Sequence, residues 1–361
     1  MKPEAELQRP RGTGRALAVV KTFVDTVGIP RLIIGAFIIG IFVLAWAQRL
    51  PIGMLVTSSL VRFGMNGVLV LAMVPSILGG EGLNFGLPVG VICGLLGALL
   101  SVEFYMRGAI GFLAALLIAV PLAVLAGWGY GLLLNRVKGE EMMIGTYVGF
   151  SVVALMCVVW IVAPFKNPEM IWVVGGKGVR MTVTITNYWA QVLNNFLKFT
   201  VAGVEIPTGL LVFFAACCLF VRWFFRTKLG LAVIAAGSNP LFAKSAGINV
   251  DQMRIVAAVM STVLGAIGLI VYAQSYGFLQ MYTAPLMMAF PAVAGILIGG
   301  ASASKASITN VVVGTLLFQT LLATALPVTR TVVAGTLSEI VNIIISQGVI
   351  LYALTRGGGR L

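Results

Sequence analysis

Long runs of apolar residues, separated by short polar or glycine-rich breaks, recur along most of the chain. A run of about 20 apolar residues is long enough to cross a bilayer as a helix. The pattern therefore predicts an all-α polytopic membrane protein with about ten transmembrane helices. The predicted spans are residues 32–48, 61–78, 89–101, 108–134, 142–163, 209–225, 255–274, 285–298, 308–325 and 337–354.

The segments outside these runs predict the topology. A polar arm, residues 1–31, precedes the first span, and residues 32–361 form one transmembrane domain. Most of the 24 Lys and Arg residues fall in the arm, in the polar loop at 227–253 and in the other segments on the same side of the membrane. Cytoplasmic loops carry an excess of basic residues. We therefore expect a multi-pass protein of the inner membrane with both termini in the cytoplasm.

Composition agrees with a membrane protein. Of the 361 residues, 60% are hydrophobic and only 10% are charged, whereas about a quarter of the residues of a soluble domain are charged. The net charge of +13 would suggest a nucleic-acid partner in a soluble protein. Here the basic residues flank apolar runs, so membrane topology and contact with lipid explain them, and no nucleic acid is expected.

Several kinds of chemistry are excluded by the residues that the sequence lacks. It contains no histidine, and its four cysteines fall in predicted spans without metal-ligand spacing. No Gly-x-x-x-x-Gly-Lys-Ser/Thr phosphate loop occurs, so this chain does not hydrolyse ATP by itself. We expect no catalytic residue, no metal site and no cofactor in this chain.

The polar loop at residues 227–253 contains a short, well-delimited helix. Asn239 is a good N-cap, and Pro240 suits the first helical position, where its missing N–H has no cost. Gly247 can adopt the left-handed conformation that closes a helix. The loop therefore predicts a helix over residues 239–246. From composition alone, it is either a connector lying on the lipid or a part that another protein pushes on.

The same loop resembles the cytoplasmic coupling loop of ABC-importer permeases of the ribose, simple-sugar, nucleoside and branched-chain amino-acid type. The shared pattern is Gly-x-x-x-x-x-x-Gly-x-Asn-Pro-x-x-Ala-x-x-x-Gly-Ile, followed by a transmembrane run. A weaker similarity continues through Gly295-Ile-Leu-Ile-Gly-Gly and Gly314. The chain departs from the family by lacking a basic residue near Val233 or Ile234.

This resemblance implies partners and contact residues. Separate ATPase subunits would bind ATP and magnesium, a second permease, identical or homologous, would complete the pathway, and an extracytoplasmic binding protein would deliver the solute. ATP-driven movement of the ATPases would act on the short helix and rock the spans. The residues implied in ATPase coupling are Gly237, Asn239, Pro240, Leu241, Phe242, Ala243, Lys244, Gly247 and Ile248.

The resemblance also implies the solute class, which is a sugar, a nucleoside or a related small hydroxylated molecule. One alternative is a branched-chain amino-acid permease. Another is an ion-coupled secondary transporter, which would need charges at membrane depth, where Glu81 is the main candidate. A third alternative is a membrane scaffold, which would not need the capped helix in the loop at residues 227–253.

A glycine-rich break between the second and third spans offers polar groups for a translocation pathway. Glu81 and Asn84 lie in this break, followed by Phe85, and Gln274 is expected near the external mouth. Acids near a membrane core tend to face cavities or partners; alternatively, Glu81 is simply solvated at the membrane surface. A similar break at Gly299-Gly300 suggests an inverted repeat with the pathway between the breaks, although both can also be ordinary turns.

Overall fold

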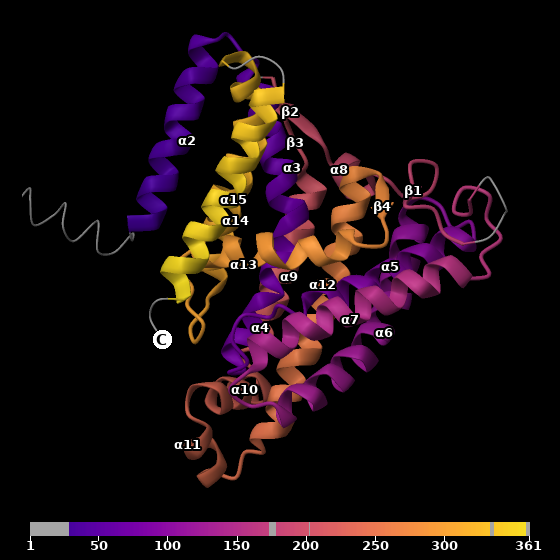
Figure 1. The fold of residues 1–361 in the computed structure, drawn as a ribbon, viewed down its shortest axis with the longest axis vertical. Coiled ribbons are helices and arrows are strands. Elements are labelled where there is room, and N and C mark those ends of the chain that lie inside the picture. The colour runs from indigo at the N-terminus through magenta and orange to yellow at the C-terminus, as the bar shows by residue number, and fades with distance from the viewer. Residues whose placement is uncertain (1–28, 173–177, 202, 333–335, 359–361) are drawn as a thin grey trace, which may run out of the picture.

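The computed structural model describes residues 29–172, 178–201, 203–332 and 336–358. These residues form an almost entirely helical protein (Figure 1). The predicted arm lies outside the described residues except for its last positions. The main helices are α2 (Ile29–Ala47), α3 (Ile52–Leu71), α4 (Met73–Leu78), α5 (Leu87–Glu103), α6 (Gly108–Arg136), α7 (Glu141–Val162), α9 (Thr208–Phe224), α10 (Lys228–Ser238), α11 (Pro240–Ser245), α12 (Val250–Tyr276), α13 (Ala289–Ile298), α14 (Ile308–Val332) and α15 (Thr336–Gly358).

The lengths and apolar composition of these helices confirm a polytopic membrane protein. Within the described residues, 6 helices are long and apolar enough to cross a membrane, counting α3 and α4 as one. The pair α9 and α10 passes the same test but is bent by 77° at the break between them. Three shorter apolar helices match the remaining predicted spans. The count of ten spans stays a prediction.

Several helices extend beyond the predicted spans, and the largest differences are at the second and ninth spans. The second span begins at Ile52 rather than at residue 61, because the polar residues of this stretch fit inside a helix. For example, the Ser59 hydroxyl donates to the Leu55 carbonyl at 2.8 Å. The ninth span continues from residue 325 to Val332, through Pro327. Hydropathy underestimates helices whose polar side chains are satisfied by their own backbone.

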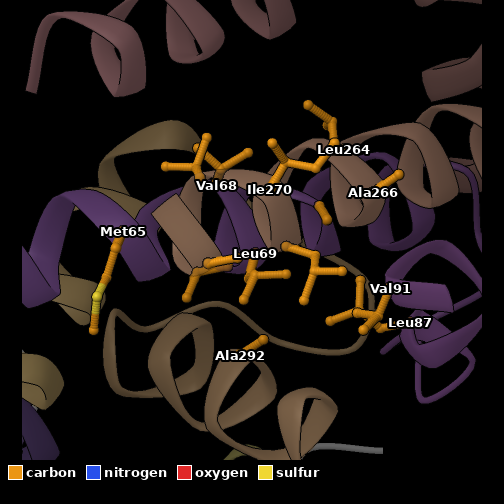
Figure 2. Close-up of a cluster of buried hydrophobic side chains, with 14 of the residues drawn as sticks. Met65, Val68, Leu69, Leu87, Val91, Leu264, Ala266, Ile270 and Ala292 are labelled. Atoms are coloured by element: carbon orange, nitrogen blue, oxygen red, sulfur yellow. The ribbon is translucent and has the colours of Figure 1, made fainter. Parts of the chain in front are cut away.

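The core forms where α12 packs against α3, α5 and α6. Small residues let these helices approach closely, as is common in membranes. A Cβ atom on Gly90 of α5 would lie 2.3 Å from the Thr262 carbonyl oxygen of α12. Around this crossing, apolar side chains from α3, α5 and α12 interlock, among them Leu69, Val91 and Ile270 (Figure 2).

The less apolar segment between α7 and α9 folds over one end of this core. It contains β1 (Thr182–Thr184), α8 (Val192–Asn195), β2 (Phe199–Val201) and β3 (Val204–Ile206). Strands β2 and β3 form a hairpin, and β1 pairs antiparallel with β4 (Phe278–Gln280), which follows α12. Asn167 anchors the segment, since its amide donates to the Val102 carbonyl at 2.9 Å and to the Tyr188 hydroxyl at 2.8 Å.

The two Gly-Gly breaks end their helices in the same way. Gly80 and Gly300 both have positive φ, at 80° and 82°. The next residue donates back over the turn in each case, from Glu81 to the Ser76 carbonyl at 3.0 Å and from Ala301 to the Ile296 carbonyl at 3.2 Å. Both are helix-closing motifs of the Schellman type. The inverted repeat that they suggested stays a prediction.

We expect the β2–β3 hairpin and the α10–α11 segment to lie on opposite sides of the membrane, because α9 is the one predicted crossing between them. Cysteines at Thr200 and Ser238, introduced into a variant without the four native cysteines, should react with an impermeant maleimide from opposite sides. Ser238→Cys should react from the cytoplasmic side. Labelling of both from one side would contradict the ten-span topology.

Candidate coupling and translocation sites

The predicted polar loop at residues 227–253 contains a helix, α10, that sequence reasoning missed. Thr227 caps it, with its side-chain oxygen accepting from the Gly230 N–H at 3.2 Å. Val233 and Ala236 are buried and hold α10 against the core. The segment is therefore more regular than the predicted polar loop, and only part of α10 is buried, since Leu229 and Leu231 are exposed.

The backbone of α10 touches the end of α4. A Cβ atom on Gly237 would lie 2.1 Å from the Leu78 carbonyl oxygen, and one on Gly80 would lie 2.9 Å from the Gly237 Cα. Glycine is therefore required on both sides of this contact. The contact joins α10 directly to the glycine-rich break that follows α4.

The structure confirms the predicted local geometry of α11. The Asn239 Oδ1 accepts from the Phe242 N–H at 3.0 Å, and Pro240 occupies the first helical position. Gly247 has a φ of 81°. The Ile248 N–H donates to the Ala243 carbonyl at 2.9 Å, which completes the cap. The helix ends at Ser245, one residue before the predicted end.

The surface of α11 presents two large apolar side chains to solvent. Leu241 is 83% exposed and Phe242 is 65% exposed, whereas Ala243 is fully buried. Lys244 adds a positive charge beside them and is also exposed. Both α10 and α11 lie at one end of the longest axis of the molecule (Figure 1). An exposed apolar pair on a rigid, capped helix is typical of a protein contact surface.

Asn84, predicted to line a pathway, is buried and tied into the core. Its amide donates to the Ser261 hydroxyl at 2.7 Å, and its carbonyl oxygen accepts from the Tyr130 hydroxyl at 3.0 Å. Ser261 in turn donates to the Ala72 carbonyl at 2.7 Å. This network links the α3–α4 junction with α6 and α12. Asn84 therefore holds these helices together through its hydrogen bonds. Its role in a pathway stays a prediction.

Glu81, in the linker between α4 and α5, is only 4% exposed. The alternative that it is simply solvated at the surface is therefore wrong. Its Oε2 accepts from the Ser76 hydroxyl at 3.3 Å, and its Oε1 has no hydrogen-bond partner within the described part of the chain. Burial raises the pKa of Glu81 to about 8, because desolvation disfavours the carboxylate more than the nearby Arg254 stabilises it. Arg254 is itself paired with Glu141 at 2.5 Å.

Gln274 and Phe85 do not join Glu81 and Asn84 in one cavity. Gln274 is fully buried beneath the segment between α7 and α9, where its amide donates to the Asn194 Oδ1 at 3.0 Å and its Oε1 accepts from the Leu193 N–H at 3.2 Å. The half-buried Phe85 packs its ring against Phe290 of α13, with the centroids 5.9 Å apart. The four predicted pathway residues thus occupy separate places in the fold.

A cavity that the sequence analysis missed lies between α3, α12, α14 and the segment leading into α13. That segment includes the 3-10 helix η1 (Ala284–Met288). The cavity has a volume of about 210 Å³. Leu69 and Ala292, which lie across from each other in Figure 2, belong to its apolar wall. Its polar lining consists of Asn66, Tyr272, Gln280 and Gln319.

Two of these residues carried a sequence signal. Asn66 and Gln319 are amides inside apolar runs, and polar groups in a span are commonly functional. Gln319 is only 3% exposed and lines the cavity, and it forms no hydrogen bond with the residues that the structure describes. In the described parts of the chain, no group of three His, Cys, Asp or Glu residues could hold a metal ion.

Comparison with known proteins identifies a family of transport proteins. A family model described as "Branched-chain amino acid transport system / permease component" matches residues 32–354. No solved structure matches the chain significantly.

Individual relatives are similar over shorter stretches. The chain is 25% identical over 194 residues to the nucleoside ABC transporter permease protein NupB of Lactococcus lactis, covering 52% of each chain. It is 26% identical over 201 residues to the galactofuranose transporter permease protein YtfT of Escherichia coli, covering 54% of this chain and 56% of that one. A stretch of 92 residues is 33% identical to the guanosine ABC transporter permease protein NupQ of Bacillus subtilis, covering 22% and 29%. The chain spans about half, or less, of the length of these curated relatives.

Burial of Glu81 predicts a pH-dependent stability. Because its pKa rises from 4.5 to about 8 on folding, the folded protein holds a proton that the unfolded chain releases within this interval. The stability from the protonated carboxyl is fully present below pH 4.5 and is lost as the pH rises to about 8. The Tm of Glu81→Gln should therefore exceed that of the wild type by more near pH 9 than near pH 5.

Thermal unfolding of the purified protein in detergent measures this difference. Glu140 is exposed and lies immediately before α7, so Glu140→Gln is the matched control, because it removes the same charge at the surface. A constant gap between Glu81→Gln and the wild type at both pH values would show that Glu81 is charged throughout.

Proposed function

The chain belongs to the branched-chain amino acid transport system permease component family, and from that premise we propose that it is the permease subunit of an ABC importer for a neutral hydroxylated solute. A nucleoside or a sugar fits this description. Relatives that are permeases for nucleosides, guanosine and galactofuranose support the solute class. The chain serves as a transport subunit, and ATP hydrolysis takes place in its partners.

The observation that carries this proposal is the exposed apolar pair on α11 together with the backbone contact of α10 with α4. Leu241 and Phe242 offer an ATPase subunit an apolar contact of defined shape. Force on α11 passes to α10, and the contact at Gly237 passes it on to the break after α4. Because α3, α4 and α12 are packed together in the core, a push at α11 shifts whole helices. Such rigid-body shifts are a common way of switching between two states.

The remaining partners follow from the same assignment. ATP and magnesium bind to the ATPase subunits, and an extracytoplasmic binding protein delivers the solute to the side of β1 and β4. A second permease, the same chain or a homologous one, covers part of the exposed apolar surface, and lipid covers the rest. The surfaces of α7 and α15 support this. Only 17% of the 18-residue apolar stretch of α7, and 12% of that of α15, is buried within the described chain.

The alternative is a permease for branched-chain amino acids, which the family description favours. A zwitterionic amino acid needs groups that pair with its ammonium and its carboxylate. The only buried acid in the described linkers and spans without an ion-pair partner is Glu81, which lies away from the large cavity. We therefore favour the neutral solute. An ion-coupled transporter would have to use the same isolated carboxyl group.

A charge placed on the tip of α11 tests the coupling role. Phe242→Asp should abolish binding of the ATPase subunit, with at least a tenfold loss in the amount that co-purifies from detergent, because the contact would bury an unpaired carboxylate. Phe196 is the matched control, since it is the same residue type, is 60% exposed and lies in the external segment. Phe196→Asp should leave co-purification of the ATPase unchanged. Equal recovery from the two variants would show that α11 is a mere connector.

Uptake by reconstituted transporters tests the solute class. Liposomes containing the permease, its ATPase and its binding protein should accumulate radiolabelled guanosine or galactose when ATP is present on the ATPase side. Leucine is the competing solute and should not accumulate. Uptake of leucine alone would overturn the neutral-solute assignment while leaving the importer assignment in place.

A further inference from the structure

We propose that the cavity between α3, α12, η1, α13 and α14 holds the solute during transport, and that it recognises one neutral ring carrying neighbouring hydroxyl groups. This inference rests on the proposed function, because it names the site and the recognised part of the same solute. Side chains from separate elements converge on this cavity, and its most buried amide, Gln319, has no hydrogen-bond partner among the described residues.

The cavity lies at a depth suited to transport. Asn66 is about 21 Å along α3–α4 from Ile52, and Gln319 is roughly 17 Å along α14 from Ile308, at a rise of about 1.5 Å per residue. Both amides are therefore near the middle of their helices. Gln280, at the end of β4, pairs with Thr182 of the segment predicted to lie outside. The cavity thus extends from the predicted outer face to about the middle of the membrane.

The hydrogen bonding of its amides differs from that of other buried amides. Asn84 and Gln274 have protein partners at both ends of their amides. Gln319 is buried and has no partner in the described chain, and Asn66 uses one N–H on the Arg62 carbonyl while its own oxygen has no donor. Buried amides in folded proteins are ordinarily paired. A solute hydroxyl would supply the missing donor and acceptor.

A second unpaired group continues the same face of α14. Thr315 lies one turn before Gln319 and is fully buried, and its hydroxyl has no hydrogen-bond partner among the described residues. Positions four apart lie on one face of a helix. By contrast, the Thr324 hydroxyl farther along α14 bonds to the Thr320 carbonyl at 2.8 Å. Unpaired polar groups therefore follow α14 inward from the cavity.

These groups match a ring with neighbouring hydroxyls. An amide has donors on its nitrogen and acceptor sites on its oxygen, and a hydroxyl both donates and accepts. Two amides on different helices can therefore each pair with one hydroxyl of a vicinal diol. The Tyr272 ring adds a flat apolar surface, and it packs on Tyr276 with the centroids 4.8 Å apart. A cavity of about 210 Å³ is smaller than the roughly 300–1,000 Å³ of sites for drug-sized ligands, so it fits one ring.

The charges around the cavity select against amino acids. No acidic residue lines it among those described, so the ammonium group of an amino acid would have no partner. Arg62 lies one turn before Asn66 and within electrostatic reach of Tyr272. No described acid forms an ion pair with Arg62. A positive charge beside the cavity raises the cost of a cationic group further.

Replacing Gln319 by leucine separates recognition from folding. If Gln319 serves the solute, Gln319→Leu should lower uptake of guanosine or galactose at least tenfold in the reconstituted importer. The same variant should keep or raise the Tm of the permease–ATPase complex, because no hydrogen bond within the described chain is lost and leucine is apolar. Gln280→Leu provides a second variant, since Gln280 is exposed, and it should lower uptake with the Tm unchanged.

Asn167 supplies the matched control. It is a buried amide whose partners are all in the protein, and it lies in the external segment away from the cavity. Asn167→Leu should lower the Tm of the complex, while uptake per folded complex stays at the wild-type rate.

The outcomes distinguish failure of the cavity proposal from failure of the proposed function. Wild-type liposomes that take up leucine but neither guanosine nor galactose would overturn the neutral-solute function itself. If the wild type takes up either neutral solute, and Gln319→Leu and Gln280→Leu take it up equally well, the proposed role of the cavity is overturned but the neutral-solute function is not. A fall in the Tm of Gln319→Leu like that of Asn167→Leu would show that Gln319 serves folding. Uptake of guanosine identifies the ring as belonging to a nucleoside, and uptake of galactose identifies it as a free sugar.

Discussion

The close contact between the backbones of α10 and the end of α4 connects the two regions that we propose to function in coupling and in solute recognition. It exists because Gly237 and Gly80 have no side chains, so the two helix ends meet at a separation that any Cβ atom would prevent. On one side of the contact, α10 leads directly into the exposed, capped helix α11. On the other side, α4 continues α3, which packs in the core and lines the large cavity. In the proposed mechanism, this contact passes a movement of α11 to the transmembrane helices.

Hydrogen bonding distinguishes the structural polar residues of the core from the candidate recognition residues. Asn84 bonds to Ser261 and Tyr130, and Ser261 bonds to the Ala72 carbonyl, so this network fixes α6 and α12 to the α3–α4 junction. In a membrane interior such pairs stabilise by only about 0.6 kcal/mol on average, so their value here is mainly in fixing the geometry. In the described chain, the Thr315 hydroxyl has no such partner, and Gln319 faces the cavity. Buried polar groups without a partner are rare in folded proteins, and this is why we propose a recognition role here.

The helices of the fold could be predicted because lipid imposes a simple rule on the sequence. A helix that crosses the bilayer must be apolar over most of its length, and this is visible residue by residue. The errors fell where polar side chains bond to their own helix, as at Ser59 of α3. They also fell at α10, where Val233 and Ala236 are buried but Leu229 and Leu231 are exposed. The contact of α10 with the end of α4 joins residues far apart in the sequence, and hydropathy carries no information about such a contact.

The sequence by itself determined the all-α membrane architecture and the form of α11. The caps at Asn239 and Gly247 depend on bonds between residues only a few positions apart, and such bonds are set by local residue type. Only the tertiary structure decided which polar residues face one another. Asn66, Tyr272, Gln280 and Gln319 come from distant parts of the chain and meet in one cavity, whereas Glu81, Asn84, Phe85 and Gln274 do not. The physical reason is that helix packing, through small residues such as Gly90 and Gly237, fixes the rotation and spacing of each helix, and these quantities decide which side chains share a cavity.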